Sequence, residues 1–162
     1  MSETLLTFGE VMGRFEPSNP KLRFPQAIPG TLTCTFAGAE SNVASDYCLL
    51  GGKAKYVTAL PEGPLTNAFM KQMRGIGVDV SDVQISKEGR MGLFFLEPGS
   101  NQRPSKVTYD RTGSSISIMG PNDYDWDRIL KDVSRLHISG ITPAISENAA
   151  NTSLAIVKEA YD

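Results

Sequence analysis

The apolar positions along the chain alternate between a strand pattern and a helix pattern. Residues 5–8 form a short apolar run, and because the run ends at Gly9-Glu10 it predicts a strand buried on both faces. Further on, Val43 and Tyr47 recur at the spacing of an amphipathic helix. The same two patterns then repeat. We expect strands near 5–8, 55–60, 78–85 and 136–141, and helices over 43–50, over 64–76, around 126 and from 147.

This alternation predicts an α/β fold with a doubly wound, mainly parallel sheet. Two segments, at about 13–36 and 90–112, interrupt it. Apolar and polar residues alternate strictly from Thr31 to Phe36, as in a half-exposed antiparallel strand. In the second segment the runs 91–97 and 106–111 flank a polar loop and predict a hairpin. We expect the two segments to form a small antiparallel β lid over the carboxyl edge of the sheet.

The last predicted helix begins near Glu147, with Ser146 as its N-cap. Its apolar residues fall on one stripe, which we expect to face the core. The stripe consists of Ala150, Leu154, Val157 and Tyr161.

Composition limits the class of protein. The 162 residues fit one domain, and a formal net charge of −2 leaves no basic stripe for a nucleic acid. Cys34 and Cys48 have no Cys or His at metal-binding spacing, so we expect no metal site. We find no apolar run near the roughly 18 residues of a membrane span and no signal-peptide pattern, and we expect a cytoplasmic protein that does not bind membranes.

Positive charge is concentrated between positions 90 and 111. The cations there are Arg90, Arg103, Lys106 and Arg111. Such a cluster on a nearly neutral chain suits a small anionic ligand, whereas a solvated loop is the alternative interpretation.

Two glycine-containing segments are candidates for ligand contact, because ligands of open α/β sheets lie outside the carboxyl ends of the strands. Gly9 and Glu10 follow the first predicted strand, and a glycine there allows a ligand to approach the backbone. Gly38 opens a helix whose first N–H groups attract negative charge, and the Asn42 amide can bind a hydroxyl. Each segment also has a purely structural interpretation, as a turn and as a helix cap.

The predicted hairpin carries the sharper signal. Tyr109 and Arg111 lie two residues apart and therefore share one face of a strand, together with Val107. Arginine can hold a carboxylate through two parallel hydrogen bonds, and tyrosine offers a flat surface and a hydroxyl to a sugar. On the facing strand, Phe94 points to the opposite side from Phe95. A surface hairpin with an unremarkable tyrosine and arginine is the alternative.

Taken in order, the motifs of the chain resemble those of the ribokinase-like (PfkB) carbohydrate kinases, and more narrowly those of the 2-keto-3-deoxygluconate kinases. The broader resemblance is carried by Gly9-Glu10, by residues 37–44 (Ala-Gly-Ala-Glu-Ser-Asn-Val-Ala), by residues 60–64 (Leu-Pro-Glu-Gly-Pro) and by residues 75–79 (Gly-Ile-Gly-Val-Asp). The narrower resemblance is carried by residues 90–97, 103–111, 137–142 and 146–149.

The resemblance implies that an acceptor sugar binds between the sheet edge and a β lid, and that the lids of two copies pair to form a homodimer. It implies ATP and Mg²⁺ as cofactors of the full-length enzyme and none on this chain alone. The implied contacts to a sugar acid come from Gly9, Glu10, Gly38, Ala39, Asn42, Phe94, Tyr109 and Arg111. Arg111 would face the carboxylate. Phe94 stands where relatives often have tyrosine, so one hydroxyl is missing.

The chain departs from the family mainly in length. Members are longer, and their catalytic aspartate belongs to a later Gly-Ala-Gly-Asp motif that is absent from these 162 residues. We therefore expect residues 1–162 to be the N-terminal part of a single sugar kinase domain, with no catalytic or nucleotide-binding residue in this chain and no kinase activity by itself. A non-catalytic module for sugar-acid binding or dimerisation is the alternative. A Rossmann-type nucleotide domain is disfavoured, because the chain has no G-x-G-x-x-G motif.

Overall fold

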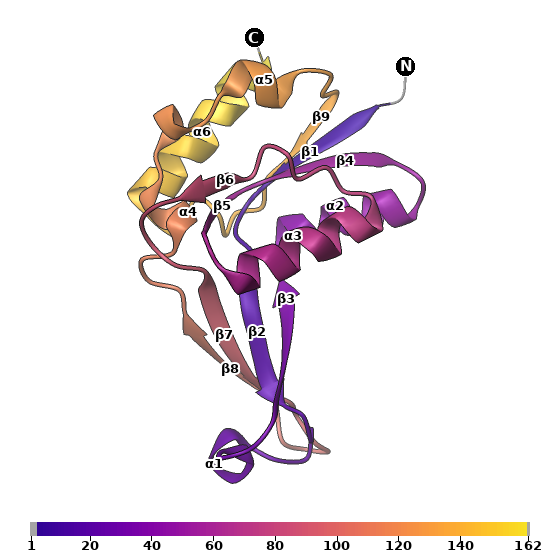
Figure 1. Ribbon diagram of the computed structural model, residues 1–162, viewed down its shortest axis with the longest axis vertical. Coiled ribbons are helices and arrows are strands. Elements are labelled where there is room, and N and C mark those ends of the chain that lie inside the picture. The colour runs from indigo at the N-terminus through magenta and orange to yellow at the C-terminus, as the bar shows by residue number, and fades with distance from the viewer. Residues whose placement is uncertain (1–2, 162) are drawn as a thin grey trace.

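The computed structural model describes residues 3–161 and consists of an α/β body from which a lid projects (Figure 1). The central sheet of the body is parallel, with the strand order β4-β1-β9. These strands are β1 (Thr4–Phe8), β4 (Lys53–Val57) and β9 (Arg135–His137). A second parallel pair is formed by β5 (Ala59–Pro61) and β6 (Gln84–Ser86). Within residues 3–161, no helix is long and apolar enough to cross a lipid bilayer.

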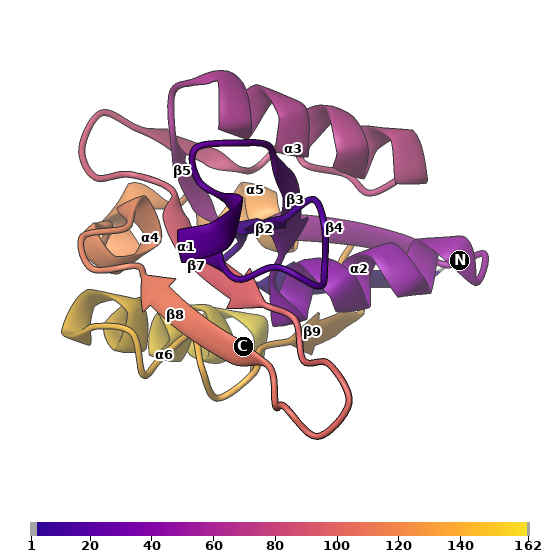
Figure 2. The ribbon, with the colours of Figure 1, turned by 90° about the horizontal axis from the view of Figure 1, so that it is seen from below.

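Helices cover the central sheet on two sides, and α3 and α6 lie on opposite sides of the molecule when it is viewed along the lid (Figure 2). One side carries α2 (Ala39–Leu49) and α3 (Pro64–Ile76). The other carries α4 (Ser115–Ile118), the 3₁₀ turn η1 (Pro121–Asp123), α5 (Trp126–Leu130) and α6 (Glu147–Tyr161).

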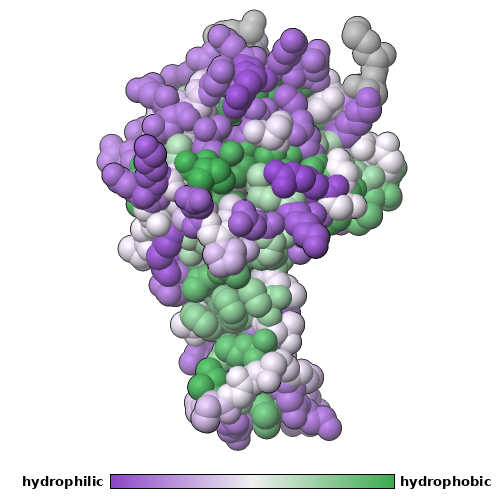
Figure 3. Space-filling view, in the orientation of Figure 1, coloured by the Kyte–Doolittle hydropathy of each residue, from purple (hydrophilic) through white to green (hydrophobic). Residues whose placement is uncertain are grey.

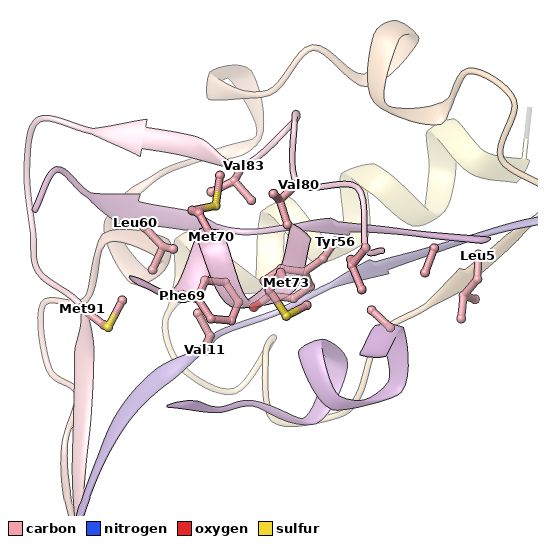
Figure 4. Close-up of a cluster of buried hydrophobic side chains, with 13 residues drawn as sticks. Leu5, Val11, Tyr56, Leu60, Phe69, Met70, Met73, Val80, Val83 and Met91 are labelled. Atoms are coloured by element: carbon pink, nitrogen blue, oxygen red, sulfur yellow. The ribbon is translucent and has the colours of Figure 1, made fainter. Parts of the chain in front are cut away.

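Strand β1 is buried on both faces, as its apolar run predicts. Leu5 packs in the core cluster beneath α2 and α3, where Phe69 and Met73 surround Tyr56 (Figure 4). Leu6 and Phe8 point the other way, into a second cluster formed with the α4–α6 side. This double burial fixes the end of β1, and with it the position of the residues that follow.

The lid is a four-stranded sheet with the order β3-β2-β7-β8. Its strands are β2 (Met12–Pro17), β3 (Leu32–Ala37), β7 (Gly92–Glu97) and β8 (Lys106–Asp110), and the short helix α1 (Phe24–Ala27) lies at its far end (Figure 1). Hydrophobic side chains cover much of the lid in the view of Figure 3. The pairs β2–β3 and β7–β8 are antiparallel, whereas β2 and β7 are parallel. The parallel pair arises because both predicted lid segments leave the body in the same direction.

The buried side of α6 differs from the predicted one. Ser146 caps the helix as expected, since its Oγ accepts a hydrogen bond of 3.0 Å from the N–H of Ala149. The predicted apolar stripe is instead largely exposed, with Leu154 at 53% and Tyr161 at 91%. The residues that face the core are Ala149, Thr152, Ser153 and Ile156. Two hydroxyls can be buried there because each donates to a carbonyl oxygen one turn earlier in the helix.

Two predicted strands are shorter than the apolar pattern suggests. Of the strand expected near 78–85, only the end forms, as β6. The start of this segment makes a single isolated bridge, between Lys55 and Asp79. The strand expected at 136–141 stops at His137. It stops because the N–H of Ser139 donates to a side chain, the carboxylate of Glu40, rather than to a neighbouring strand.

Candidate functional site

The end of β1 and the start of α2 cross at a very short distance. A Cβ atom at Gly38 would lie 2.3 Å from the carbonyl oxygen of Glu10, and one at Gly9 would lie 2.2 Å from the carboxylate carbon of Glu40. At position 38 only glycine fits, because the obstacle is backbone, whereas a side chain at position 9 would have to displace the Glu40 carboxylate. We call the surface formed by Gly9, Glu10 and residues 38–42 the ledge.

Tyr56 fixes the backbone of the ledge at Gly9. The Tyr56 hydroxyl donates a hydrogen bond of 2.7 Å to the carbonyl oxygen of Gly9. Complete burial raises the pKa of Tyr56 well above its ordinary value, so the hydroxyl keeps its proton and remains a donor. Gly9 also donates its own N–H to Val57 at 3.2 Å. The backbone of the ledge is therefore fixed by β4.

The exposed part of the ledge is the first turn of α2. Gly38 is the N-cap, and its carbonyl oxygen accepts from the N–H of Asn42 and from the hydroxyl of Ser41, both at 3.0 Å. The Asn42 side chain is exposed, and its amide makes no hydrogen bond within the described residues 3–161. Free backbone N–H groups and this amide can together bind hydroxyl or carbonyl oxygens.

Arg111 connects the lid to the ledge. It follows β8 and forms an ion pair with Glu10, whose side chain is only 3% exposed, compared with 20% for Arg111. Gly92 leaves room for this pair, since a Cβ atom there would lie 2.8 Å from Oε1 of Glu10. Glu10 thus lies within the predicted site, with one carboxylate oxygen bound to Arg111 and the other, Oε1, buried and unpaired.

The predicted lid residues lie together on one face. The strand register places Phe94 beside Tyr109, with ring centroids 6.0 Å apart. The guanidinium carbon of Arg111 lies 5.8 Å from the centroid of the Tyr109 ring, at cation–π distance. Tyr109 is 60% exposed. Phe95 points to the opposite face, as predicted, and packs there against two other phenylalanines.

Arg111 also lines a cavity of about 330 Å³ between the base of the lid and the turn that follows β9. Its other walls include Gly113, Ser117, Ile141 and Ser146. Arg111 is the only charged residue in the lining of this cavity, and its guanidinium is paired with Glu10.

The remaining cations of the predicted basic cluster do not join Arg111. Arg90 pairs with Asp110 on the opposite face of the lid base, and also donates to the carbonyl oxygen of Asp110 at 2.6 Å. Arg103 and Lys106 line a separate cavity of about 310 Å³ together with Arg23. The cluster seen in the sequence therefore divides among three places.

Glu40 is the residue of this region that sequence reasoning missed. Its side chain is fully buried and accepts hydrogen bonds from Ser139 and Thr142, about 100 residues later in the chain. The sequence did offer one indication, because Glu40 is a charged residue in the first turn of a helix, close to Gly38 and Asn42, which were expected to contact a ligand. The distant partners could not be deduced from one sequence.

Comparison with known proteins defines the class of this protein. Residues 2–162 match the model of the pfkB family of carbohydrate kinases, and the chain belongs to this family. Solved structures with the same fold confirm the predicted ribokinase-like fold class. One of them is the 2-dehydro-3-deoxygluconokinase of Thermotoga maritima, with a TM-score of 0.92 and 37% sequence identity, over 98% of this chain and 48% of that one.

Two curated relatives are similar in sequence. The 2-dehydro-3-deoxygalactonokinase of Haloferax volcanii is 34% identical over 162 residues, which are all of this chain and 49% of the relative. The 2-dehydro-3-deoxygluconokinase of Bacillus subtilis is 30% identical over 141 residues, or 87% of this chain and 42% of the relative. The chain thus spans about half the length of the curated relatives that it matches.

Proposed function

We propose that the protein to which this chain belongs phosphorylates a 2-keto-3-deoxy sugar acid such as 2-keto-3-deoxygluconate with ATP. The chain would supply the acceptor-binding ledge and the lid of a single kinase domain, including the segments 13–36 and 90–112. The observation that carries this proposal is the position of Arg111, which is bound to the ledge residue Glu10 and packed on Tyr109. The names of the relatives support the same class of substrate.

The geometry suits an acidic sugar in the following way. Glu10 occupies one side of the Arg111 guanidinium, and the other side borders the 330 Å³ cavity, where a carboxylate could accept hydrogen bonds. Tyr109 and Phe94 offer apolar ring surface to the carbon chain. Asn42, Gly38 and Ala39 would bind hydroxyl oxygens at the first turn of α2. A neutral sugar would lack the group that Arg111 is placed to bind.

ATP and Mg²⁺ are assigned to the longer protein. Among residues 3–161, no three His, Cys, Asp or Glu side chains gather as ligands for a metal ion. The contribution of this chain is to bind and orient the acceptor, which for phosphoryl transfer is a large part of catalysis.

The alternative is a non-catalytic module for sugar-acid binding or dimerisation. One observation favours an assembly role for the lid: all of β8 is exposed, including Val107 at 41% and Tyr109 at 60%. Exposed apolar side chains on an edge strand favour pairing with another copy. A homodimer through the lid, and a cytoplasmic location for the protein, belong to this proposal in either form.

Calorimetry with 2-keto-3-deoxygluconate tests the acceptor site. We expect the chain to bind this sugar acid and to bind fructose at least about tenfold more weakly, since a charged hydrogen bond contributes roughly 1.5–3 kcal/mol. Arg111→Ala should lose most of the affinity. Arg103→Ala, at the far end of the lid, is the control and should bind normally.

Arg111→Ala leaves Glu10 buried without its partner, so a second variant is needed in case the first does not fold. The double variant Glu10→Gln/Arg111→Gln keeps a neutral hydrogen-bonded pair in the same place. Equal binding by wild type and by both variants would refute the assignment of Arg111. Sugar-dependent ATP hydrolysis, measured on the longer protein, then separates the kinase from the non-catalytic module.

A further inference from the structure

The Glu40 carboxylate joins two segments that lie far apart in the sequence. Its Oε1 atom accepts three hydrogen bonds, from the N–H of Ser139 at 2.9 Å, from the hydroxyl of Ser139 at 2.6 Å and from the hydroxyl of Thr142 at 3.0 Å. Glu40 itself is 0% exposed. A carboxylate this deeply buried is costly unless hydrogen bonds compensate, and here all three donors come from the turn after β9.

The charge of Glu40 is supported from its own side as well. Glu40 lies in the first turn of α2, where the helix dipole favours a negative charge. Hydrogen bonds to an ionised acceptor are roughly twice as strong as those between neutral groups. The helix start and the 139–142 turn are therefore held together by a charge-assisted contact.

The second carboxylate oxygen of Glu40 faces Gly9. Oε2 is buried without a hydrogen-bond partner, and it lies 2.2 Å from where a Cβ atom of Gly9 would be. The carboxylate therefore fills the space that a side chain at position 9 would occupy. Glu40 packs against Gly9 through one oxygen and binds the 139–142 turn through the other.

Both segments border the proposed acceptor site. The first turn of α2 carries Gly38 and Asn42, while Ile141 in the 139–142 turn lines the cavity beside Arg111. We propose that Glu40 is a positioning residue for the acceptor, which sets the distance between the hydroxyl-binding ledge and the wall of the cavity next to Arg111. This inference rests on the proposed function, because it concerns how the same site holds a sugar acid.

Glu40→Gln tests the inference with little change in volume. Its amide retains one acceptor oxygen but loses the charge, and it places an NH₂ group against Gly9. The matched control is Glu147→Gln, because Glu147 is an exposed acid in the first turn of another helix, α6. Two quantities are measured on each protein: the dissociation constant for 2-keto-3-deoxygluconate by calorimetry, and the hydrogen exchange rate of the Ser139 amide by NMR.

We expect Glu40→Gln to bind the sugar acid at least about tenfold more weakly and to exchange the Ser139 amide faster, because the charged acceptor is lost. Glu147→Gln should change neither quantity. If Glu40→Gln does not fold, Thr142→Val removes one of the three donors at similar volume, and it should weaken binding by about threefold.

The outcomes separate this inference from the proposed function. A wild-type chain that does not bind the sugar acid would refute the proposed function and the role of Glu40 within it. A wild-type chain that binds, with a variant that binds equally well although its Ser139 amide exchanges faster, would refute the positioning role alone. An unchanged Ser139 amide in Glu40→Gln would also refute it, since the contact would then not hold the turn.

Discussion

The hydroxyl of Tyr56 donates a hydrogen bond to the carbonyl oxygen of Gly9, and this contact links the core of the body to the ledge. Tyr56 belongs to β4, which pairs with β1, and its ring packs against Phe69 of α3. The position of Gly9 is therefore determined by the packing of the core beneath α2 and α3.

Removing this hydroxyl should destabilise the protein without creating a large cavity. Tyr56→Phe leaves the Gly9 carbonyl oxygen without its buried donor, which should cost about 1–3 kcal/mol in the free energy of unfolding. Urea denaturation measures this difference. Tyr109→Phe is the control, because Tyr109 is mostly exposed, and its stability should stay within about 0.5 kcal/mol of wild type. Equal stability of Tyr56→Phe and wild type would contradict the importance of the contact.

The raised pKa of Tyr56 predicts a pH dependence of the same difference. Burial favours the neutral phenol in the folded state, so the folded pKa lies above the unfolded value of about 10. The stability contributed by the neutral phenol is complete below pH 10 and is lost as the pH rises above it. The advantage of wild type over Tyr56→Phe should therefore be constant from pH 7 to about 9.5 and shrink at higher pH. A difference that grows with pH would contradict this assignment.

Gly38 should not tolerate a side chain. Gly38→Ala would place a Cβ atom 2.3 Å from the backbone oxygen of Glu10, and because backbone cannot move aside easily, we expect a loss of at least about 2 kcal/mol and weaker sugar-acid binding. Gly75→Ala in α3 is the matched control, since its Cβ atom would meet nothing within 4 Å. That variant should be stabilised by about 0.4–1 kcal/mol. Thermal or urea unfolding of both variants tests the pair.

The orientation of α6 can be tested by truncating one residue on each side. Ile156 is fully buried, and Ile156→Ala should lower the free energy of unfolding by about 2–5 kcal/mol. Leu154 is 53% exposed, and Leu154→Ala should lower it by less than about 0.5 kcal/mol. A larger loss of stability for Leu154→Ala than for Ile156→Ala would show that the stripe predicted from the sequence is the buried side of α6.

The sequence predicts where the helices and strands of this fold lie better than it predicts which side of each is buried. The apolar run of β1 identifies a strand because both of its faces are buried. The alternation in β3 also identifies a strand, although its burial does not alternate and the apolar Cys34 is exposed. For α6 the pattern favours Leu154 and Val157, yet Thr152 and Ser153 are the buried residues. Their hydroxyls bond within the helix, so burial costs them little, and hydropathy alone cannot reveal this.

The candidate site, too, could be predicted only in part from the sequence. Tyr109 and Arg111 could be placed on one face of their strand because strand periodicity fixes the direction of each side chain. The same rule separates Phe94 from Phe95 on the facing strand, but it does not say which of the two lies beside Tyr109. The pairing of Arg111 with Glu10, and that of Glu40 with Ser139, join residues about 100 positions apart. No local pattern encodes such contacts, since they depend on how the lid and the β9 turn fold back onto the ledge.

Asp110 and Arg111 are neighbours in the chain, yet their ion pairs lie on opposite faces of the lid base, with Arg90 and with Glu10. Arg90 and Asp110 both belong to the lid segment 90–112, so their ion pair joins two parts of the lid, whereas the ion pair of Arg111 with Glu10 joins the lid to the ledge. A swing of the lid away from the ledge would therefore break the contact with Glu10 and leave the contact with Arg90 intact, and a ligand that competes with Glu10 for Arg111 would release the lid from the ledge.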